Sequence, residues 1–253
     1  MKKIIDVNVM LGPWKSPTRY STAEGLYKYL DDYRIAAAVV YHSAAQMNPW
    51  EYNGEISRIA GESGGRLRAC HVLDPMLVEK SEPGEGTLLE RLKANRPAAV
   101  RLLPRAQKYP LNAFFCDQVL GVLNELRLPL LLDAGEMPPV EDIPVLARDF
   151  PDMPIVILRH YFNNSRSLTP LLVKLSNVYI DMNITIDTGY LEELVNERCG
   201  SEKLLFGSGL PHHVPAGGLS MILYSTIDER HKKNILHANW ERLQGGIRYD
   251  DQG

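Results

Sequence analysis

Short apolar runs alternate with amphipathic segments along the whole chain. The runs predict eight strands, at about residues 3–9, 36–41, 67–72, 98–103, 129–133, 154–159, 177–182 and 203–207. They lack the alternation of apolar and polar side chains that marks a half-exposed strand, which is typical of parallel strands covered on both faces. Helix start signals lie between them, such as the capping box Ser21-Thr22-Ala23-Glu24, the asparagine Asn112 and the pair Pro138-Pro139. The pattern predicts an α/β protein.

Two architectures fit this order of elements: a closed TIM-like (β/α)8 barrel and an open doubly wound sheet. The first strand is followed by Leu11-Gly12-Pro13-Trp14, and not by the GxGxxG turn of dinucleotide-binding sheets. The length of 253 residues matches one barrel of about 250 residues. We therefore expect a single barrel domain over residues 1–253.

Charge and cysteine content narrow the range of partners. The net charge is −3 with both signs interspersed, which predicts neither nucleic-acid nor membrane binding. The three cysteines are widely spaced, which argues against a disulfide framework or a structural zinc site. No apolar run approaches the roughly 20 residues of a membrane span. We expect a cytoplasmic protein that binds a small molecule and forms a homo-oligomer.

Three motifs follow one another in a specific order: IIDVNVMLG at residues 4–12, LLFGSGLP at residues 204–211 and NILHANWERL at residues 234–243. They resemble the opening strand, the eighth strand and the closing helix of the amidohydrolase superfamily. The resemblance is to the amidohydrolase-related branch that includes aminocarboxymuconate semialdehyde decarboxylase, and it covers nearly the whole chain. It implies a TIM barrel with a metal site at the carboxyl ends of its strands.

The metal positions implied by the resemblance are mostly altered. Asn8 and Met10 stand where the two first-strand histidines are expected. Asp133 stands where the fifth-strand histidine is expected and Gly209 replaces the eighth-strand aspartate, so only His160 matches. A catalytic zinc site needs about three protein ligands and an open position, and only two good ligands remain. We therefore expect no cofactor, with zinc or manganese as the alternative.

Ionisable side chains gather at the predicted carboxyl ends of the strands, where parallel barrels place their active sites. We expect His160 and Asp133 to be catalytic, because a carboxylate beside an imidazole fixes its tautomer and raises its basicity. Arg101 lies inside an apolar strand, so it needs an anionic partner, either a substrate or a structural aspartate such as Asp133 or Asp6. The predicted substrate-binding residues are Arg101, Arg159, Asn8, Glu136, His212 and Trp14.

The leading hypothesis is a metal-independent enzyme acting on a small, anionic, carboxylated or cyclic compound, as a lactonase-like hydrolase or as a lyase. The alternative is a non-catalytic relative that binds a small molecule, because the fold alone does not determine catalysis. A third hypothesis is a metal-dependent hydrolase with a rebuilt site formed by Asp133, His160 and His212.

Overall fold

The computed structural model describes residues 2–13, 15, 18–78, 86–159, 165–183 and 189–250. Within these ranges one sheet of eight strands is formed, and all neighbouring strands are parallel and follow chain order. The strands are β1 (Ile5–Leu11), β2 (Ala37–His42), β3 (Leu67–Leu73), β4 (Ala99–Leu102), β5 (Leu130–Asp133), β6 (Ile155–Leu158), β7 (Val178–Asp181) and β8 (Leu204–Leu205). Each overlaps a run predicted from the sequence.

The sheet closes on itself between its first and last strands. Val7 N–H donates to the carbonyl of Phe206 at 3.0 Å, and Met10 N–H donates to the carbonyl of Leu210 at 2.9 Å. Gly209 N–H returns a bond of 2.9 Å to the carbonyl of Asn8. These bonds confirm the TIM-like (β/α)8 barrel and exclude the open doubly wound sheet.

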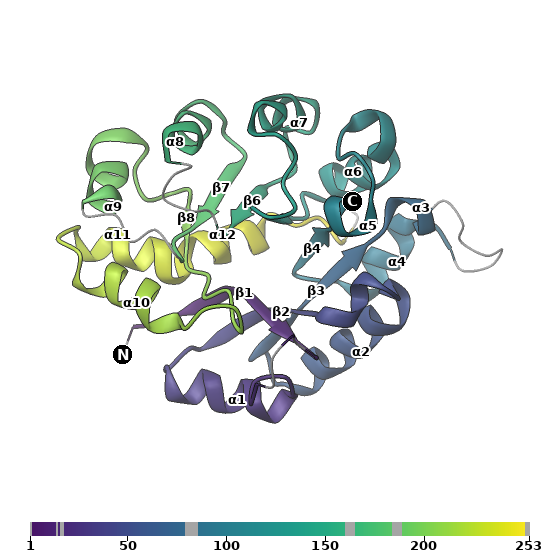
Figure 1. Ribbon diagram of the computed structural model, residues 1–253, viewed down its shortest axis with the longest axis horizontal. Helices are drawn as coiled ribbons and strands as arrows, with labels where there is room; N and C mark the ends of the chain where they lie inside the picture. The colour runs from purple at the N-terminus through teal and green to yellow at the C-terminus, as the bar shows by residue number, and fades with distance from the viewer. Residues whose placement is uncertain are drawn as a thin grey trace.

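Helices form a ring around the strands (Figure 1). Their N-termini follow the local signals in part. Asn112 caps α6 by accepting from Phe114 and Phe115 N–H, as predicted, whereas the cap of α1 is Thr22, one residue after Ser21, the first residue of the predicted capping box. The α-helices are α1 (Ala23–Asp32), α2 (Pro49–Glu62), α3 (Pro75–Val78), α4 (Leu88–Asn95), α5 (Pro104–Gln107), α6 (Ala113–Leu126), α7 (Ile143–Asp149), α8 (Ser165–Lys174), α9 (Tyr190–Glu193), α10 (Pro215–Tyr224), α11 (Glu229–Lys233) and α12 (Asn239–Gly245).

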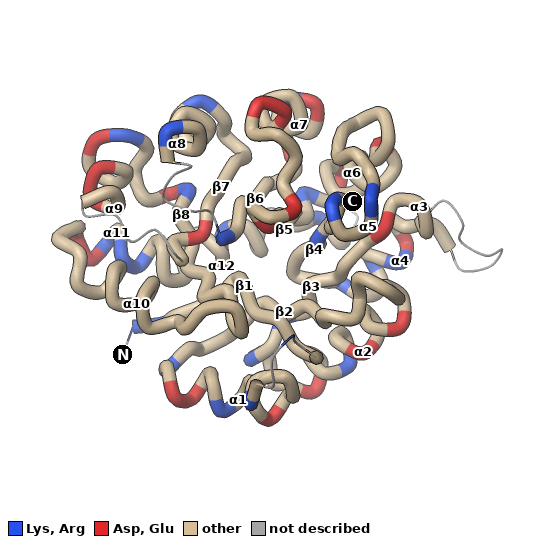
Figure 2. Tube along the Cα trace, viewed as in Figure 1, with Lys and Arg blue, Asp and Glu red and all other residues tan. Residues whose placement is uncertain are grey.

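Shorter helical turns complete the ring. Two are 3₁₀ turns, η1 (Ser43–Gln46) and η2 (Val140–Asp142), and two are π turns, η4 (Leu194–Arg198) and η5 (Asn234–Ala238). The prolines at 138 and 139 precede η2, so α7 begins four residues later than the sequence suggests. Acidic and basic residues are interspersed over the outer helices (Figure 2).

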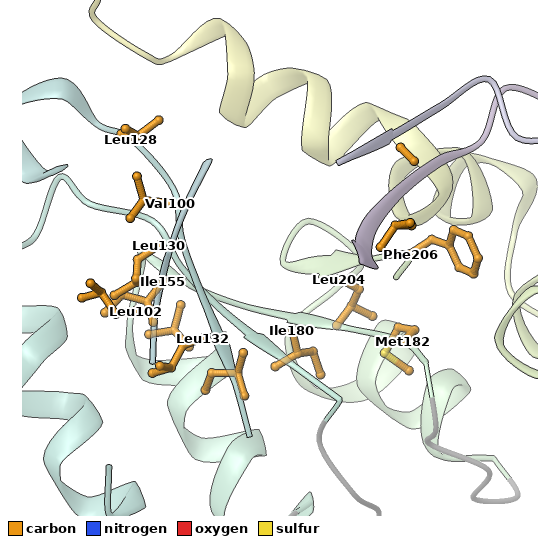
Figure 3. Close-up of a cluster of buried hydrophobic side chains, with 14 of the residues drawn as sticks. Val100, Leu102, Leu128, Leu130, Leu132, Ile155, Ile180, Met182, Leu204 and Phe206 are labelled. Carbon is orange, nitrogen blue, oxygen red and sulfur yellow. The ribbon is translucent and has the colours of Figure 1, made fainter. Parts of the chain in front are cut away.

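The core has two layers, one on each face of the barrel wall. Side chains such as Leu130, Leu132 and Ile155 point outward and pack under the helices (Figure 3). The intervening residues, such as Leu131 and Val156, belong to a separate cluster inside the barrel. Side chains of successive strand residues point to opposite faces, so continuous apolar runs supply both layers. Each fully buried leucine or isoleucine contributes about 1.5–3 kcal/mol.

Among the described residues, no helix combines the length and apolar character that crossing a membrane requires.

Candidate active site

A cavity of about 340 Å³ lies at the carboxyl ends of the strands, where the sequence places the ionisable residues. Its walls come from β1, β2, β4, β5 and the segments that follow β5, β6 and β8. Its polar and ionisable lining includes Lys15, Tyr41, Arg101, Asp133, Glu136, Arg159 and His212. The barrel therefore brings together residues that are up to about two hundred positions apart, as the prediction of a polar rim requires.

Arg101 is the buried cation of this cavity. Only 3% of the residue is exposed, and its Nη2 donates to Asn8 Oδ1 at 2.7 Å. Its guanidinium carbon lies 4.0 Å from the ring centroid of Tyr41. Its Nε is buried and has no hydrogen-bond partner in the described part of the chain. The groups in direct contact with Arg101 include the neutral Asn8 amide, the Tyr41 ring and the Cys70 thiol, and its charge also helps to lower the pKa of Asp133.

The structural partners predicted for Arg101 have other partners. Asp6 accepts from Tyr29 Oη at 2.6 Å and from Ser208 N–H at 2.8 Å. Asp133 accepts from Arg159 Nε at 2.5 Å. Arg101 donates instead to the side chain of Asn8, a residue that was predicted to bind substrate.

Asp133 ends β5 and is 5% exposed. Burial raises its pKa, but the hydrogen bond and charge of Arg159, assisted by Arg101, outweigh burial and hold that pKa below its ordinary value. The carboxyl is therefore ionised at neutral pH. Arg159 reaches it from the end of β6 with a left-handed backbone, φ 52°. A positive φ in a residue other than glycine is uncommon and often marks a functional position.

Two residues predicted to form the site, His160 and Trp14, lie outside the described residues. The pairing of His160 with Asp133 therefore stays a prediction. The partner of Asp133 within the described chain is Arg159.

Asn8 lies behind Arg101 and does not line the cavity. It is 3% exposed, and its Nδ2 donates to Asp181 Oδ2 at 3.2 Å. Asp181 also accepts from Arg159 N–H at 2.8 Å. Complete burial raises the pKa of Asp181 to about 7, against the lowering effect of these two hydrogen bonds.

Glu136 and His212 both line the cavity but differ in their contacts. Glu136 Oε2 accepts from the N–H groups of Arg105 and Ala106, at 2.8 and 3.0 Å, and so caps α5. Burial, followed by the charge of Arg159, lowers the pKa of His212 to about 4. The imidazole is therefore neutral at neutral pH and a weak proton acceptor.

Gly209 has a left-handed backbone with φ 68°. A Cβ atom added there would lie 2.4 Å from Asn183 Nδ2 and 3.1 Å from Arg159 Cδ. The space that an aspartate side chain would need at this position is therefore filled by its neighbours.

Tyr41 and Lys15 line the cavity but were not among the predicted substrate-binding residues. A signal existed for Tyr41, because it follows an apolar run at a strand end, where the barrel places its site. Lys15 lies in an irregular segment after β1, where the sequence pattern offers no such signal.

The sequence matches the amidohydrolase family over residues 25–245. No protein among curated sequences matches it significantly. The family match confirms the resemblance that the three sequence motifs suggest.

Several solved structures share the fold over nearly the whole chain. The 5-carboxyvanillate decarboxylase of Sphingomonas paucimobilis has a TM-score of 0.76 at 13% identity, covering 97% of this chain and 99% of that one. A dihydroxybenzoic acid decarboxylase of Polaromonas sp., with bound manganese and 2-nitroresorcinol, has a TM-score of 0.73 at 12% identity and 97% coverage of both chains. A probable 2-pyrone-4,6-dicarboxylic acid hydrolase of Acinetobacter baumannii, with citric acid bound, has a TM-score of 0.69 at 19% identity, covering 96% and 99%.

The bound manganese in the Polaromonas structure corrects the expectation that no cofactor accompanies this kind of site. That expectation was wrong because it considered only the positions where the family resemblance places metal ligands. The fold itself is able to hold a divalent ion.

The side chains described for this chain fit such an ion poorly. No group of three or more His, Cys, Asp or Glu side chains in the described ranges is placed to hold a metal. The guanidinium groups of Arg101 and Arg159 line the same cavity, and like charges repel strongly at short range. Asp133 is already paired with Arg159. The function proposed for this chain therefore includes no step on a metal.

Proposed function

The chain belongs to the amidohydrolase family, and we propose that it is an enzyme acting on a small carboxylated compound in the cavity at the barrel mouth. The observation that carries the proposal is the buried Arg101, whose direct contacts, Asn8, Tyr41 and Cys70 among them, are uncharged groups. Burying a cation is costly unless an anion compensates it. A substrate carboxylate supplies that anion and matches the planar geometry of the guanidinium.

Arg159 is the proposed second contact to the substrate. It donates to Asp133 at 2.5 Å, and its side chain is 23% exposed beside the cavity. An incoming carboxylate competes with Asp133 for this guanidinium. The loss of that hydrogen bond would raise the pKa of Asp133 and make it a stronger proton acceptor. Asp133, together with His160, is the proposed proton-transfer group.

The proposed reaction is either a lactonase-like hydrolysis or the cleavage of a carbon–carbon bond, as in decarboxylation. Support comes from the names of the fold relatives, two of which are decarboxylases and one a hydrolase of carboxylated rings. Decarboxylation breaks the bond to a positioned carboxylate and replaces it with a proton, whereas hydrolysis adds water to the lactone carbonyl and breaks the ring C–O bond. Both need a group that exchanges a proton with the substrate or the water. His212, neutral at neutral pH and on the cavity wall, is a further candidate for hydrogen bonding to the substrate.

The test begins with binding of benzoate, 2,6-dihydroxybenzoate and 2-pyrone-4,6-dicarboxylate by isothermal titration calorimetry. We expect the wild type to bind at least one of them and Arg101→Gln to bind it about 10–150-fold more weakly, since a hydrogen bond to a charged group contributes about 1.5–3 kcal/mol. Arg58→Gln is the control, because Arg58 lies on the exposed face of α2 and pairs with Glu62.

Turnover is then followed by ultraviolet absorbance and carbon dioxide release, with and without added manganese. Consumption of a bound carboxylate supports an enzyme. Binding without any turnover would support the non-catalytic, small-molecule-binding alternative. Failure of all three carboxylates to bind would refute the proposed function.

A further inference from the structure

Three buried side chains form a hydrogen-bonded line that leads from the cavity into the barrel. Arg101 Nη2 donates to Asn8 Oδ1 at 2.7 Å, and Asn8 Nδ2 donates to Asp181 Oδ2 at 3.2 Å. The exposed fractions of Arg101, Asn8 and Asp181 are 3%, 3% and 0%. Arg101 is the member of this line that faces the cavity.

The orientation of the Asn8 amide follows from its two neighbours. A guanidinium has only donors, so the amide oxygen of Asn8 must face Arg101. The amide nitrogen then faces Asp181 and donates to its Oδ2, and a flipped amide would lose the bond to Arg101. The backbone of Asn8 is held as well, since its N–H donates to Asp6 Oδ1 at 3.0 Å.

The neutrality of the Asn8 side chain matters as much as its hydrogen-bond geometry. A carboxylate at this position would hold Arg101 at the same distance but would also neutralise it. A neutral amide orients the guanidinium and leaves its positive charge for a ligand. Asp6 is hydrogen-bonded to Tyr29, and Asp133 is hydrogen-bonded to Arg159 while also feeling the charge of Arg101.

We propose that Asn8 is a positioning residue that makes the cavity selective for anions, by orienting Arg101 through a hydrogen bond without neutralising its charge. Asp181 supports this role by keeping the amide in the required orientation. Asn8 itself does not touch the ligand. This inference rests on the proposed function, because it concerns the same anion site.

The test compares benzoate with benzamide, its uncharged analogue of nearly the same shape, by calorimetric titration. We expect the wild type to bind benzoate about tenfold or more tightly than benzamide, because only benzoate forms a charge-assisted bond with Arg101. Asn8→Asp should lose this preference by weakening benzoate binding about tenfold while leaving benzamide binding unchanged. A merely structural defect would weaken both ligands alike.

Two further variants separate charge from shape. Asn8→Leu removes the hydrogen bond without adding charge, so benzoate should bind more weakly and the preference for benzoate over benzamide should fall, but by less than in Asn8→Asp. Asn95→Asp adds the same charge at the exposed end of α4 and should change neither affinity. In an Arg101→Gln background, Asn8→Asp should no longer affect benzoate binding.

The outcomes distinguish the two proposals. A wild type that binds neither carboxylates nor benzamide, or that binds benzamide as tightly as benzoate, would refute the anion site and the inference with it. A wild type that prefers benzoate through Arg101, with an Asn8→Asp variant that keeps this preference, would overturn the role of Asn8 alone. Should Asn8→Asp fail to fold, an Asn8→Leu variant that keeps the full preference for benzoate would also overturn it.

Discussion

Replacing Gly209 with alanine tests the claim that its neighbours have filled the space at the end of the last strand. The added Cβ would meet Asn183 Nδ2 at 2.4 Å and Arg159 Cδ at 3.1 Å, on a backbone with φ 68°. The Asn183 side chain, whose Nδ2 is buried, would have to shift to admit this Cβ.

The expected cost has two parts. A left-handed backbone with a Cβ atom costs about 1–2 kcal/mol, and overpacking at a buried contact costs about 1–3 kcal/mol. Gly209→Ala should therefore lower the free energy of unfolding by about 2–5 kcal/mol. Gly64 is the matched control, because it has φ 62° and no heavy atom within 4 Å of an added Cβ. Gly64→Ala should cost only the backbone part, about 1–2 kcal/mol.

Urea unfolding followed by circular dichroism measures both values. For a chain of this size, a difference of 1 kcal/mol corresponds to about 2–4 °C in Tm, so thermal unfolding provides a second readout. Equal losses of stability in the two variants would refute the reasoning, because crowding at Gly209 would then contribute nothing.

Three further predictions concern buried polar groups. Arg159→Gln removes the partner that lowers the pKa of Asp133. In urea titrations, the loss of stability relative to wild type should therefore be larger at pH 7 than at pH 3. A loss of stability that does not depend on pH would contradict this prediction. Burial raises the pKa of Asp181 from 3.8 to about 7, which removes stability as the pH rises between those values. The stability of Asp181→Asn relative to wild type should therefore be higher at pH 8 than at pH 4. A higher relative stability at pH 4 would contradict this prediction. Tyr29→Phe deletes the 2.6 Å bond to Asp6 and should cost about 1–3 kcal/mol in unfolding free energy, whereas a change under about 0.5 kcal/mol would show the bond to be dispensable.

The fold was predictable because its signal is carried by many residues. Continuous apolar runs such as Leu130–Leu132 are required of any strand covered on both faces, so all eight strands could be found from the sequence. The prediction of a barrel over an open sheet was correct, although it rested only on the absence of a glycine-rich turn and on no signal for barrel closure. The bonds that close the barrel join residues about two hundred positions apart, and no local pattern reports them.

Part of the cavity lining was predictable from the sequence, but the partners of these residues were not. Arg101, Asp133 and Arg159 were identified because they lie at strand ends, and the cavity brings them together. Arg159 pairs with Asp133 from a left-handed backbone conformation. The sequence gives no signal for this conformation in a residue other than glycine. The role of Asn8 behind Arg101 depends on which way two side chains face across the barrel, and periodicity alone does not give that direction.

The closure of the barrel has a consequence for the order in which a newly made chain can fold. Asp6 accepts from the backbone of Ser208, 202 residues further along, so the first strand has no neighbour on one side until nearly the whole chain has left the ribosome. Until then its free edge can pair with another growing chain. Chaperone dependence should therefore be greatest for translation intermediates that end just before Ser208, and should fall once the residues of the final strand emerge.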